Sequence, residues 1–338
     1  LLRGFSAPVI LDDGKNQAAR LGLLQVETDG FAKWDAATRV VCDALSTAYQ
    51  HHADLICTDA MLQAFQNILE DNTLDMALRA MLLTPPGFEE VVSGLADIDV
   101  VRIEALRDAY AKTLGEARWD ALRAMYIKLW DAETHEMNAE AYQRRSLRNV
   151  CLLLMMKARP DAARQYCETQ FNAAKTMTDK LASFNLLANH PDETCRTQAI
   201  DAFYSAFKQD DLVLDKWFSV QAASVVPGAL VRVKALLSHE AFDLKNPNKV
   251  RAVIGAFCQN NPRHFHAVDN SGYDFLAEQI LMLDALNPQI AARLATPFTR
   301  FQRFDAVRQA GMQAALKRLS AAKISPDLRE LVDKSIEM

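Results

Sequence analysis

Glycine is scarce in this chain, and that scarcity limits the available folds more than any other feature. Only 11 of the 338 residues are glycine, which is about 3% against the roughly 7% of an average protein. Nucleotide-binding α/β sheets, β-barrels and phosphate-binding loops need glycine where a side chain would block a turn or a close approach. The composition therefore favours helices joined by short turns. Half of the residues are hydrophobic, which is enough for a large core.

Charge, cysteine and hydropathy patterns indicate a soluble intracellular protein. The net charge of −5 is mild and disfavours a strongly basic nucleic-acid binder. The six cysteines lie at least 15 residues apart, without a CxxC pair, which is typical of reduced thiols. No leader with the charge and hydropathy of a signal peptide is evident, and the longest uncharged run, 217–231, is too short to span a bilayer. We expect a cytoplasmic location and neither a nucleic-acid nor a membrane partner.

Apolar residues recur at helical spacing through most of the chain. In the segment 138–158, Leu147, Cys151, Leu154 and Ala158 follow the spacing of one helix face. Four dipeptides place a capping side chain before a proline that suits the first helical position: Asn246-Pro247, Asn261-Pro262, Asn287-Pro288 and Ser325-Pro326. Pro297 lies inside an otherwise helical run, and we expect a kink or a break there.

The spacing of the predicted helices indicates a solenoid. Helix starts are predicted near residues 138, 160, 176, 191, 210, 228, 247, 271, 288, 304 and 325. Similar helices are predicted at 31–50, 58–83, 100–113 and 116–132. Antiparallel helix pairs of this length stack into superhelical arrays of the HEAT or armadillo kind. Because no sequence signature repeats, we expect an all-α, irregular array that forms one domain over 13–338.

The first ten residues differ from the rest. They are apolar and extended in pattern, and Pro8 forbids a helix interior there. No partner strand is evident downstream. We therefore expect residues 1–12 to be the remnant of a preceding β domain, so that the chain is a piece of a longer protein.

Histidine patterns give little support for catalysis. His135-Glu136 resembles the start of the zinc-binding HExxH pattern, but residue 139 is alanine, so the second ligand is missing. His264, His266 and Asp269 could chelate a metal if they lay in one loop, although capping and packing roles are favoured. His51-His52 is interpreted as a solvated helix end. No glycine-rich phosphate loop and no GxSxG motif occur. We expect no catalytic and no metal-binding residues in this chain.

Basic residues concentrate near the C-terminus. Residues 288–323 contain seven arginines and lysines against a single acid, Asp305, which gives a net charge of +6 against −11 for the rest of the chain. A solvated basic face offset by acidic neighbours is the favoured interpretation. A surface for anions, such as a peptide carboxylate, an acidic domain face or a phosphate, is the functional alternative.

Short motifs along the chain resemble the bacterial aminopeptidase N family of zinc-dependent alanyl aminopeptidases, of the gluzincin type. They occur in the family's order over nearly the whole chain, most densely after residue 246. The motifs are LRGFSAPV at 2–9, FAKWDA at 31–36, SLRNVC at 146–151, MTD at 177–179, DKWF at 215–218, NPNKVR at 246–251, IGAF at 254–257, FHA at 265–267, SGY at 271–273 and NPQIAARL at 287–294. The resemblance is weak over 51–100.

The resemblance implies that the chain is the family's C-terminal helical domain. Such a domain caps the catalytic domain and encloses a cavity that limits access to small peptides. The family's HExxH zinc helix and its other catalytic motifs have no match here. The resemblance thus implies a metallopeptidase activity and a zinc cofactor for the parent enzyme, and none for this chain alone. The implied partners are the upstream catalytic domain of the same polypeptide and peptides.

Two arginines lie on family-matching motifs, Arg251 in NPNKVR and Arg293 in NPQIAARL. The resemblance implies that they face the cavity and bind the C-terminal carboxylate of a peptide through charge-assisted hydrogen bonds. The structural alternative is that they only stabilise helix ends. For the chain as a whole, the alternative function is an independent HEAT-like adaptor that binds a protein or an anionic partner.

Overall fold

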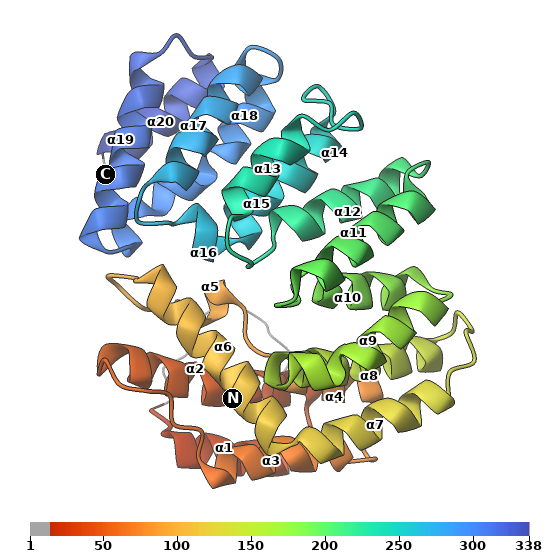
Figure 1. The fold of residues 1–338 in the computed structure, drawn as a ribbon. Coiled ribbons are helices and arrows are strands. Elements are labelled where there is room, and N and C mark those ends of the chain that lie inside the picture. The colour runs from red at the N-terminus through yellow and green to blue at the C-terminus, as the bar shows by residue number, and fades with distance from the viewer. Residues whose placement is uncertain (1–13, 338) are drawn as a thin grey trace. The chain divides into compact units, whose positions relative to one another are not determined.

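The computed structural model describes residues 14–337 and consists of helices joined by short turns (Figure 1). The predicted all-α fold is confirmed. In the part that is described, β pairing is limited to one isolated parallel bridge between Ile98 and Phe304. The strand remnant expected at 1–12 lies outside the described residues.

The chain forms two compact units. The first, unit 1, contains residues 14–93 and 102–186, and the second, unit 2, contains residues 94–101 and 187–337. Unit 2 is therefore built from two separate stretches of the sequence. The single domain expected over 13–338 stays a prediction.

Unit 1 is made of the first ten helices. They are α1 (Gln17–Val26), α2 (Gly30–Gln50), α3 (Asp59–Glu70), α4 (Met76–Leu83), α5 (Phe88–Val91), α6 (Val100–Ala117), α7 (Trp119–Asp131), α8 (Ala139–Ala158), α9 (Pro160–Ala173) and α10 (Met177–Leu187). The first two residues of α6 and the last residue of α10 belong to unit 2. Helix α8 is central, because it packs against α4, α7 and α9.

Unit 2 contains the remaining helices. They are α11 (Glu193–Phe207), α12 (Asp211–Ala222), α13 (Ala229–Leu237), α14 (Pro247–Val250), the π-helix η1 (Arg251–Gly255), α15 (Ala256–Asn260), α16 (Pro262–Phe265), α17 (Ser271–Asp284), α18 (Pro288–Leu294), the 3-10 helix η2 (Thr296–Arg303), α19 (Ala306–Ala321) and α20 (Pro326–Glu337). Here α12 packs against α11, α13 and η1, while α17 packs against α18 and α19. Neighbours in sequence are thus neighbours in space, as in a helical array.

The predicted helix starts from residue 138 onward agree with the observed ones to within two residues. In the N-terminal third, the helical segment expected over 58–83 consists of two helices, α3 and α4, because the polar turn 71–75 ends one helix and Asp75 caps the next through the backbone N–H of Leu78. Helix α1, before Gly30, was not predicted.

Proline positions have the expected effect. Helices α14, α16, α18 and α20 each begin at the predicted proline, and Asn246 and Asn287 cap two of them. Asn261 is an exception, because its amide donates instead to the carbonyl oxygens of Ala222 and Ser224, at 3.1 and 2.9 Å. The break expected at Pro297 is confirmed, since α18 ends at Leu294 and a 3-10 helix follows.

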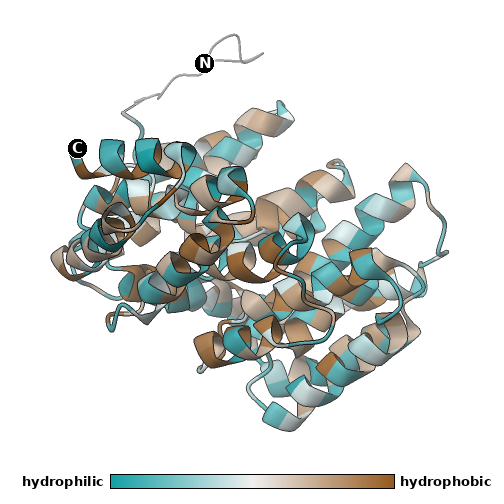
Figure 2. Cartoon of the chain, turned by 90° about the horizontal axis from the view of Figure 1, so that it is seen from above, coloured by the Kyte–Doolittle hydropathy of each residue, from teal (hydrophilic) through white to brown (hydrophobic). Residues whose placement is uncertain are grey.

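Hydrophobic and hydrophilic residues are mixed along the helices, which Figure 2 shows as brown and teal segments within the same helix. Helices α6 and α8 approach closely where Gly115 faces the carbonyl of Leu154. A Cβ at this glycine would overlap that oxygen and contact Ala158 at 2.8 Å. The few glycines present therefore include positions at which a side chain cannot fit.

The stretch 94–101 is fixed within unit 2 by its backbone. The N–H of Ile98 donates to the carbonyl of Arg303 at 2.9 Å, and the carbonyl of Ile98 accepts from the N–H of Asp305 at 3.3 Å. Asp99 lies 3.5 Å from the guanidinium of Arg308. Ile98 itself is completely buried.

Candidate functional site

Arg251 and Arg293 lie on different helices of unit 2. Arg251 begins the π-helical segment η1, and Arg293 lies in the last turn of α18. Both side chains are exposed, and within residues 14–337 neither forms an ion pair or donates a side-chain hydrogen bond. Their guanidinium groups are therefore available to an anion from solution. Within the described residues, no side chain is hydrogen-bonded or ion-paired to both arginines.

The local sequence explains the position of Arg251. Asn246 caps α14 through the N–H of Asn248, and Pro247 occupies the first helical position. Lys249, two residues before Arg251, is buried and pairs with Asp215 at 2.8 Å. Lys249 is thus neutralised inside the unit, whereas Arg251 faces the solvent. Short π-helical segments such as η1 often occur at functional positions.

His264, His266 and Asp269 have three separate roles and do not converge. The Nε2 of His264 donates to the carbonyl of Val225 at 3.0 Å. His266 is buried, with its Nδ1 at 2.8 Å from the hydroxyl of Tyr273. Asp269 accepts from the backbone N–H of Ser271 at 3.0 Å in an exposed turn. The HxHxxD pattern therefore reflects three separate packing and turn contacts.

The buried environment of His266 lowers the pKa of its imidazole strongly. Its ring stacks on Phe304 at 4.4 Å between centroids. Burial lowers its pKa to about 3, assisted by the positive charge of Arg308 and opposed by Asp305. Burial likewise raises the pKa of Tyr273 well above its usual range. The imidazole is therefore neutral at physiological pH and serves as a polar group of the core.

His135 and Glu136 lie in the loop between α7 and α8, not on a helix. His135 has a left-handed backbone conformation with φ 59°, and Glu136 accepts from the side chain of Asn138 at 2.7 Å. An HExxH zinc site needs both histidines on one helix face, so this loop does not fit one. His51 and His52 are exposed at the end of α2, as predicted.

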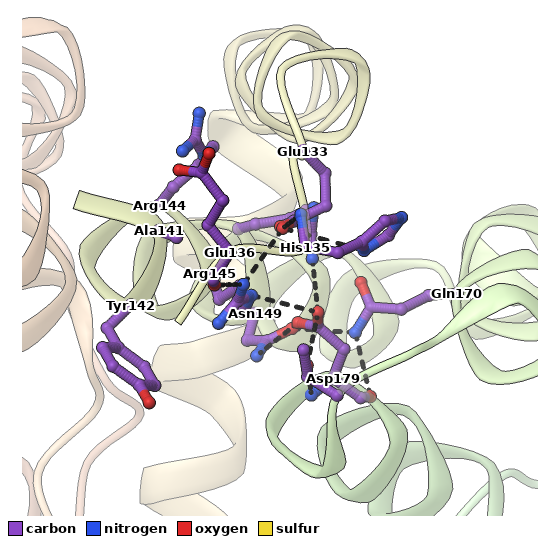
Figure 3. Close-up of polar contacts among 12 residues, drawn as sticks. Glu133, His135, Glu136, Ala141, Tyr142, Arg144, Arg145, Asn149, Gln170 and Asp179 are labelled. Carbon is purple, nitrogen blue, oxygen red and sulfur yellow. Dashed lines mark hydrogen bonds and ion pairs between the residues drawn. The ribbon is translucent and has the colours of Figure 1, made fainter. Parts of the chain in front are cut away.

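The densest group of charges in unit 1 is a buried arginine–carboxylate network between α8, α10 and the α7–α8 loop (Figure 3). Arg145 and Arg148 have fully buried side chains. Arg148 lies 3.0 Å from Glu133 and 2.7 Å from Asp179. Arg145 lies 3.2 Å from Glu133 and 3.8 Å from Asp179. Two positive and two negative charges thus neutralise one another inside the unit.

Neighbouring polar groups extend this network. Asn149 donates to Asp179 at 3.3 Å and accepts from Gln170 at 2.8 Å. Burial alone would raise the pKa of Glu133, but the N–H of His135 and the two arginines outweigh it and lower that pKa. The network joins the α7–α8 loop and α10 to α8.

This network was not predicted from the sequence. Arg145 and Arg148 lie on the same helix as the predicted apolar stripe, three residues apart. Charged residues at this spacing are ordinarily solvated. Their burial depends on Glu133 and Asp179, which come from separate elements, and only the tertiary structure brings these together.

The basic segment 288–323 is not one uniform face. Arg308 is buried and pairs with Asp305 and Asp99. Arg318 is exposed and faces Asp274 at 3.8 Å and Glu278 at 3.6 Å. Acidic neighbours thus offset part of the segment, in agreement with the favoured interpretation.

Unit 1 also contains a pocket of about 540 Å³ beside the loop between α2 and α3. Its lining includes Asp43, Thr47, His51 and Asp54. Asp43 is paired with Arg20 at 2.9 Å. The pocket therefore offers few groups of fixed charge for recognition.

Among residues 14–337, three or more histidine, cysteine or acidic side chains nowhere gather closely enough to hold a metal ion. No helix in the same range combines the length and hydropathy needed to cross a membrane.

Comparison with known proteins gives consistent matches. The family model of the domain of unknown function DUF3458_C, described as ARM repeats, matches residues 17–337. The chain is 35% identical to aminopeptidase N of Escherichia coli strain K12 over 99% of its own length and 39% of that protein. It is 33% identical to aminopeptidase N of Haemophilus influenzae over 100% of its length, again with 39% of that protein covered.

A solved structure shows the same fold. The crystal structure of Legionella pneumophila aminopeptidase A in complex with aspartic acid matches with a TM-score of 0.92 and 27% identity, over 99% of this chain and 40% of that one. The chain thus spans about two fifths of the length of these relatives. It belongs to the DUF3458_C family of ARM-repeat domains, and it matches the C-terminal domain of bacterial aminopeptidase N.

Proposed function

We propose that this chain is the non-catalytic C-terminal domain of a cytoplasmic zinc aminopeptidase of the aminopeptidase N type. In the parent enzyme it covers the upstream catalytic domain, limits access to small peptides and holds them while their N-terminal residues are removed. The observation that carries the proposal is the match to aminopeptidase N over 99% of this chain but 39% of that protein. The zinc and the hydrolytic residues are assigned to the remaining part of the parent.

The proposal assigns Arg251 and Arg293 to the carboxylate end of the bound peptide. Both guanidinium groups are exposed and lack an intramolecular acid in the described part of the chain. A guanidinium donates two parallel hydrogen bonds to a carboxylate, which gives both affinity and orientation. The net charge of −5 is consistent with peptides, and not nucleic acids, as ligands.

The non-catalytic role is tested with the purified chain. We expect no hydrolysis of alanine p-nitroanilide and no stoichiometric zinc by metal analysis. Hydrolysis that a chelator abolishes would contradict the proposal. Sequencing the gene upstream of Leu1 gives an independent test, because we expect an HExxH motif in the same reading frame.

The role of the two arginines is tested by peptide binding to the purified chain. A tripeptide with a free carboxylate is compared with its C-terminal amide by isothermal titration calorimetry. A hydrogen bond to a charged group contributes about 1.5–3 kcal/mol, so we expect Arg251→Gln and Arg293→Gln each to weaken binding of the acid by about 10- to 100-fold. Binding of the amide should change little.

Arg318→Gln is the matched control, because Arg318 is also exposed but faces two acidic side chains of α17. We expect this control to leave peptide binding unchanged. Equal affinities of wild type, Arg251→Gln and Arg293→Gln for the free acid would remove the carboxylate role from these arginines without affecting the family assignment.

A further inference from the structure

Three basic side chains from three helices of unit 2 meet at two adjacent loops. Arg196 comes from α11, Arg232 from α13 and His264 from α16. The loops are 188–192, between α10 and α11, and 223–228, between α12 and α13. They lie side by side, because the N–H of Val225 donates to the side-chain oxygen of Asn189 at 3.0 Å.

Each basic side chain is held in place by backbone carbonyl groups. Arg196 donates from Nη1 to the carbonyls of His190 and Pro191, both at 2.7 Å. Arg232 donates from its two terminal nitrogens to the carbonyls of Val226 and Pro227, both at 2.6 Å. His264 donates from Nε2 to Val225 at 3.0 Å.

These fixed side chains keep unused hydrogen-bond donors. The Nε and Nη2 of Arg196 and the Nε of Arg232 make no hydrogen bond with other residues in the range 14–337. The Nδ1 of His264 also has no partner in that range, and it becomes a donor when the ring is protonated. All three side chains are half-buried, so the donors are preorganised and still reachable from solvent.

No carboxylate neutralises this cluster within the described part of the chain. Arg196, Arg232 and His264 form no ion pair there, in contrast to the buried Arg145, Arg148 and Arg308, each of which has acidic partners. Asp192, the residue before α11, uses its carboxylate to cap that helix through the N–H of Cys195 at 2.7 Å.

The positive charges act on one another. Burial and then the neighbouring Arg196 lower the pKa of Arg232. Burial lowers the pKa of His264 despite its bond to Val225, and Arg263 and Arg232 lower it further. Arg196 and Arg232 are also the fourth residues of their helices, close to the positive end of the helix dipole.

We propose that Arg196, Arg232 and His264 form a binding site for a small oxyanion, either a phosphate group or a carboxylate. Two or three oxygen atoms of such an ion can accept from the remaining donors and compensate the positive charges. The site is separate from the proposed function, because it uses neither Arg251 nor Arg293 and lies on other helices.

The test compares the thermal stability of the whole chain in inorganic phosphate, in acetate and in chloride, at matched ionic strength and at pH 6.0 as well as 7.0, because His264 gains its second donor only when its ring is protonated. A ligand that binds the folded state raises the Tm as its concentration exceeds its Kd. We expect phosphate or acetate to raise the Tm of the wild type above its value in chloride. Phosphate also stabilises folded proteins in general, so a site is identified by the part of the Tm increase that Arg196→Gln and Arg232→Gln lose. Loss of the response to phosphate alone identifies a phosphate site, and loss of the response to acetate identifies a carboxylate site.

Variants separate an anion site from a loop brace. We expect Arg196→Gln and Arg232→Gln each to weaken anion binding at least tenfold in isothermal titration calorimetry, and His264→Gln to weaken it less. Arg318→Gln is the control and should respond to the anions like the wild type. Arg196→Gln and Arg232→Gln are independent, so the failure of one to fold leaves the other as the test.

The proposal is overturned if the wild type has the same Tm in all three salts. It is also overturned if both arginine variants keep the wild-type response to the anion while their Tm falls equally in every salt. That second result would show that the arginines only brace the two loops.

Discussion

The buried histidine of unit 2 makes a quantitative prediction about acid stability. His266 packs between Phe304 and Tyr273, and burial holds its pKa near 3 in the folded chain. In the unfolded chain the imidazole returns to about 6.5. Since the folded pKa is the lower one, this residue contributes stability above pH 6.5, and the contribution is lost progressively as the pH falls toward 3.

The magnitude follows from the two pKa values. At pH 7.5 neither state carries the proton. At pH 5.0 the unfolded chain carries nearly one proton on His266 and the folded chain almost none. One pKa unit corresponds to about 1.4 kcal/mol, so lowering the pH from 7.5 to 5.0 costs about 2 kcal/mol at this residue.

The assay compares wild type with His266→Asn, which retains a hydrogen-bonding side chain for Tyr273 but cannot titrate. The free energy of unfolding of each protein is measured in urea at pH 7.5 and pH 5.0. We expect the acid-induced loss to be about 2 kcal/mol larger in the wild type. The NMR signal of the His266 ring should also show a neutral imidazole at pH 5.0. An imidazole that titrates near 6.5, or an equal pH dependence of the two proteins, would refute the reasoning.

Two further predictions concern packing and buried charge. Gly272→Ala should lower the free energy of unfolding by at least about 2 kcal/mol, because the new Cβ would overlap the carbonyl of Phe265. The control is Gly22→Ala, at an exposed position of α1 with open space around it, and it should raise the free energy of unfolding by about 0.5–1 kcal/mol. Equal changes of the two variants in urea unfolding would contradict the steric role of Gly272. Arg148→Met should cost about 3–5 kcal/mol by leaving Asp179 buried with reduced compensation. A double-mutant cycle with Asp179→Asn should show coupling between the two residues, and additive effects would argue against it.

The helices were predictable where the signals are local. Asn246, Asn287 and the prolines that follow them determine where α14 and α18 begin, because a cap and a fixed φ act within a few residues. The break at Pro297 is local for the same reason. Asn261 shows the limit of such reasoning. Its sequence context is that of a cap, yet its amide binds carbonyls near residue 223 that no local rule brings close.

The charged clusters could not be predicted, because their members are far apart in sequence. Arg148 meets Glu133 and Asp179 only after three elements have packed together. Arg196 and Arg232 likewise lie on α11 and α13, with α12 between them in sequence, and they are near one another because their loops are joined through Asn189 and Val225. Arg251 and Arg293 were selected from a resemblance, and the structure adds that both are exposed. Their role stays a prediction until peptide binding is measured.

The stretch 94–101 affects how the protein can be divided and how it is made. A chain that starts at residue 187 lacks Ile98 and Asp99, and with them the backbone pairing to Arg303 and Asp305 and the contact to Arg308. During synthesis this stretch is made about 200 residues before the segment 303–308 that it contacts in the folded unit. The apolar side chain of Ile98 therefore lacks these native contacts until that segment has been made. Unit 2 is therefore not a continuous segment of the sequence. Cutting the chain at residue 187 removes the stretch 94–101 from unit 2. In the whole chain, this stretch can adopt its native contacts only after the C-terminal helices have been synthesised.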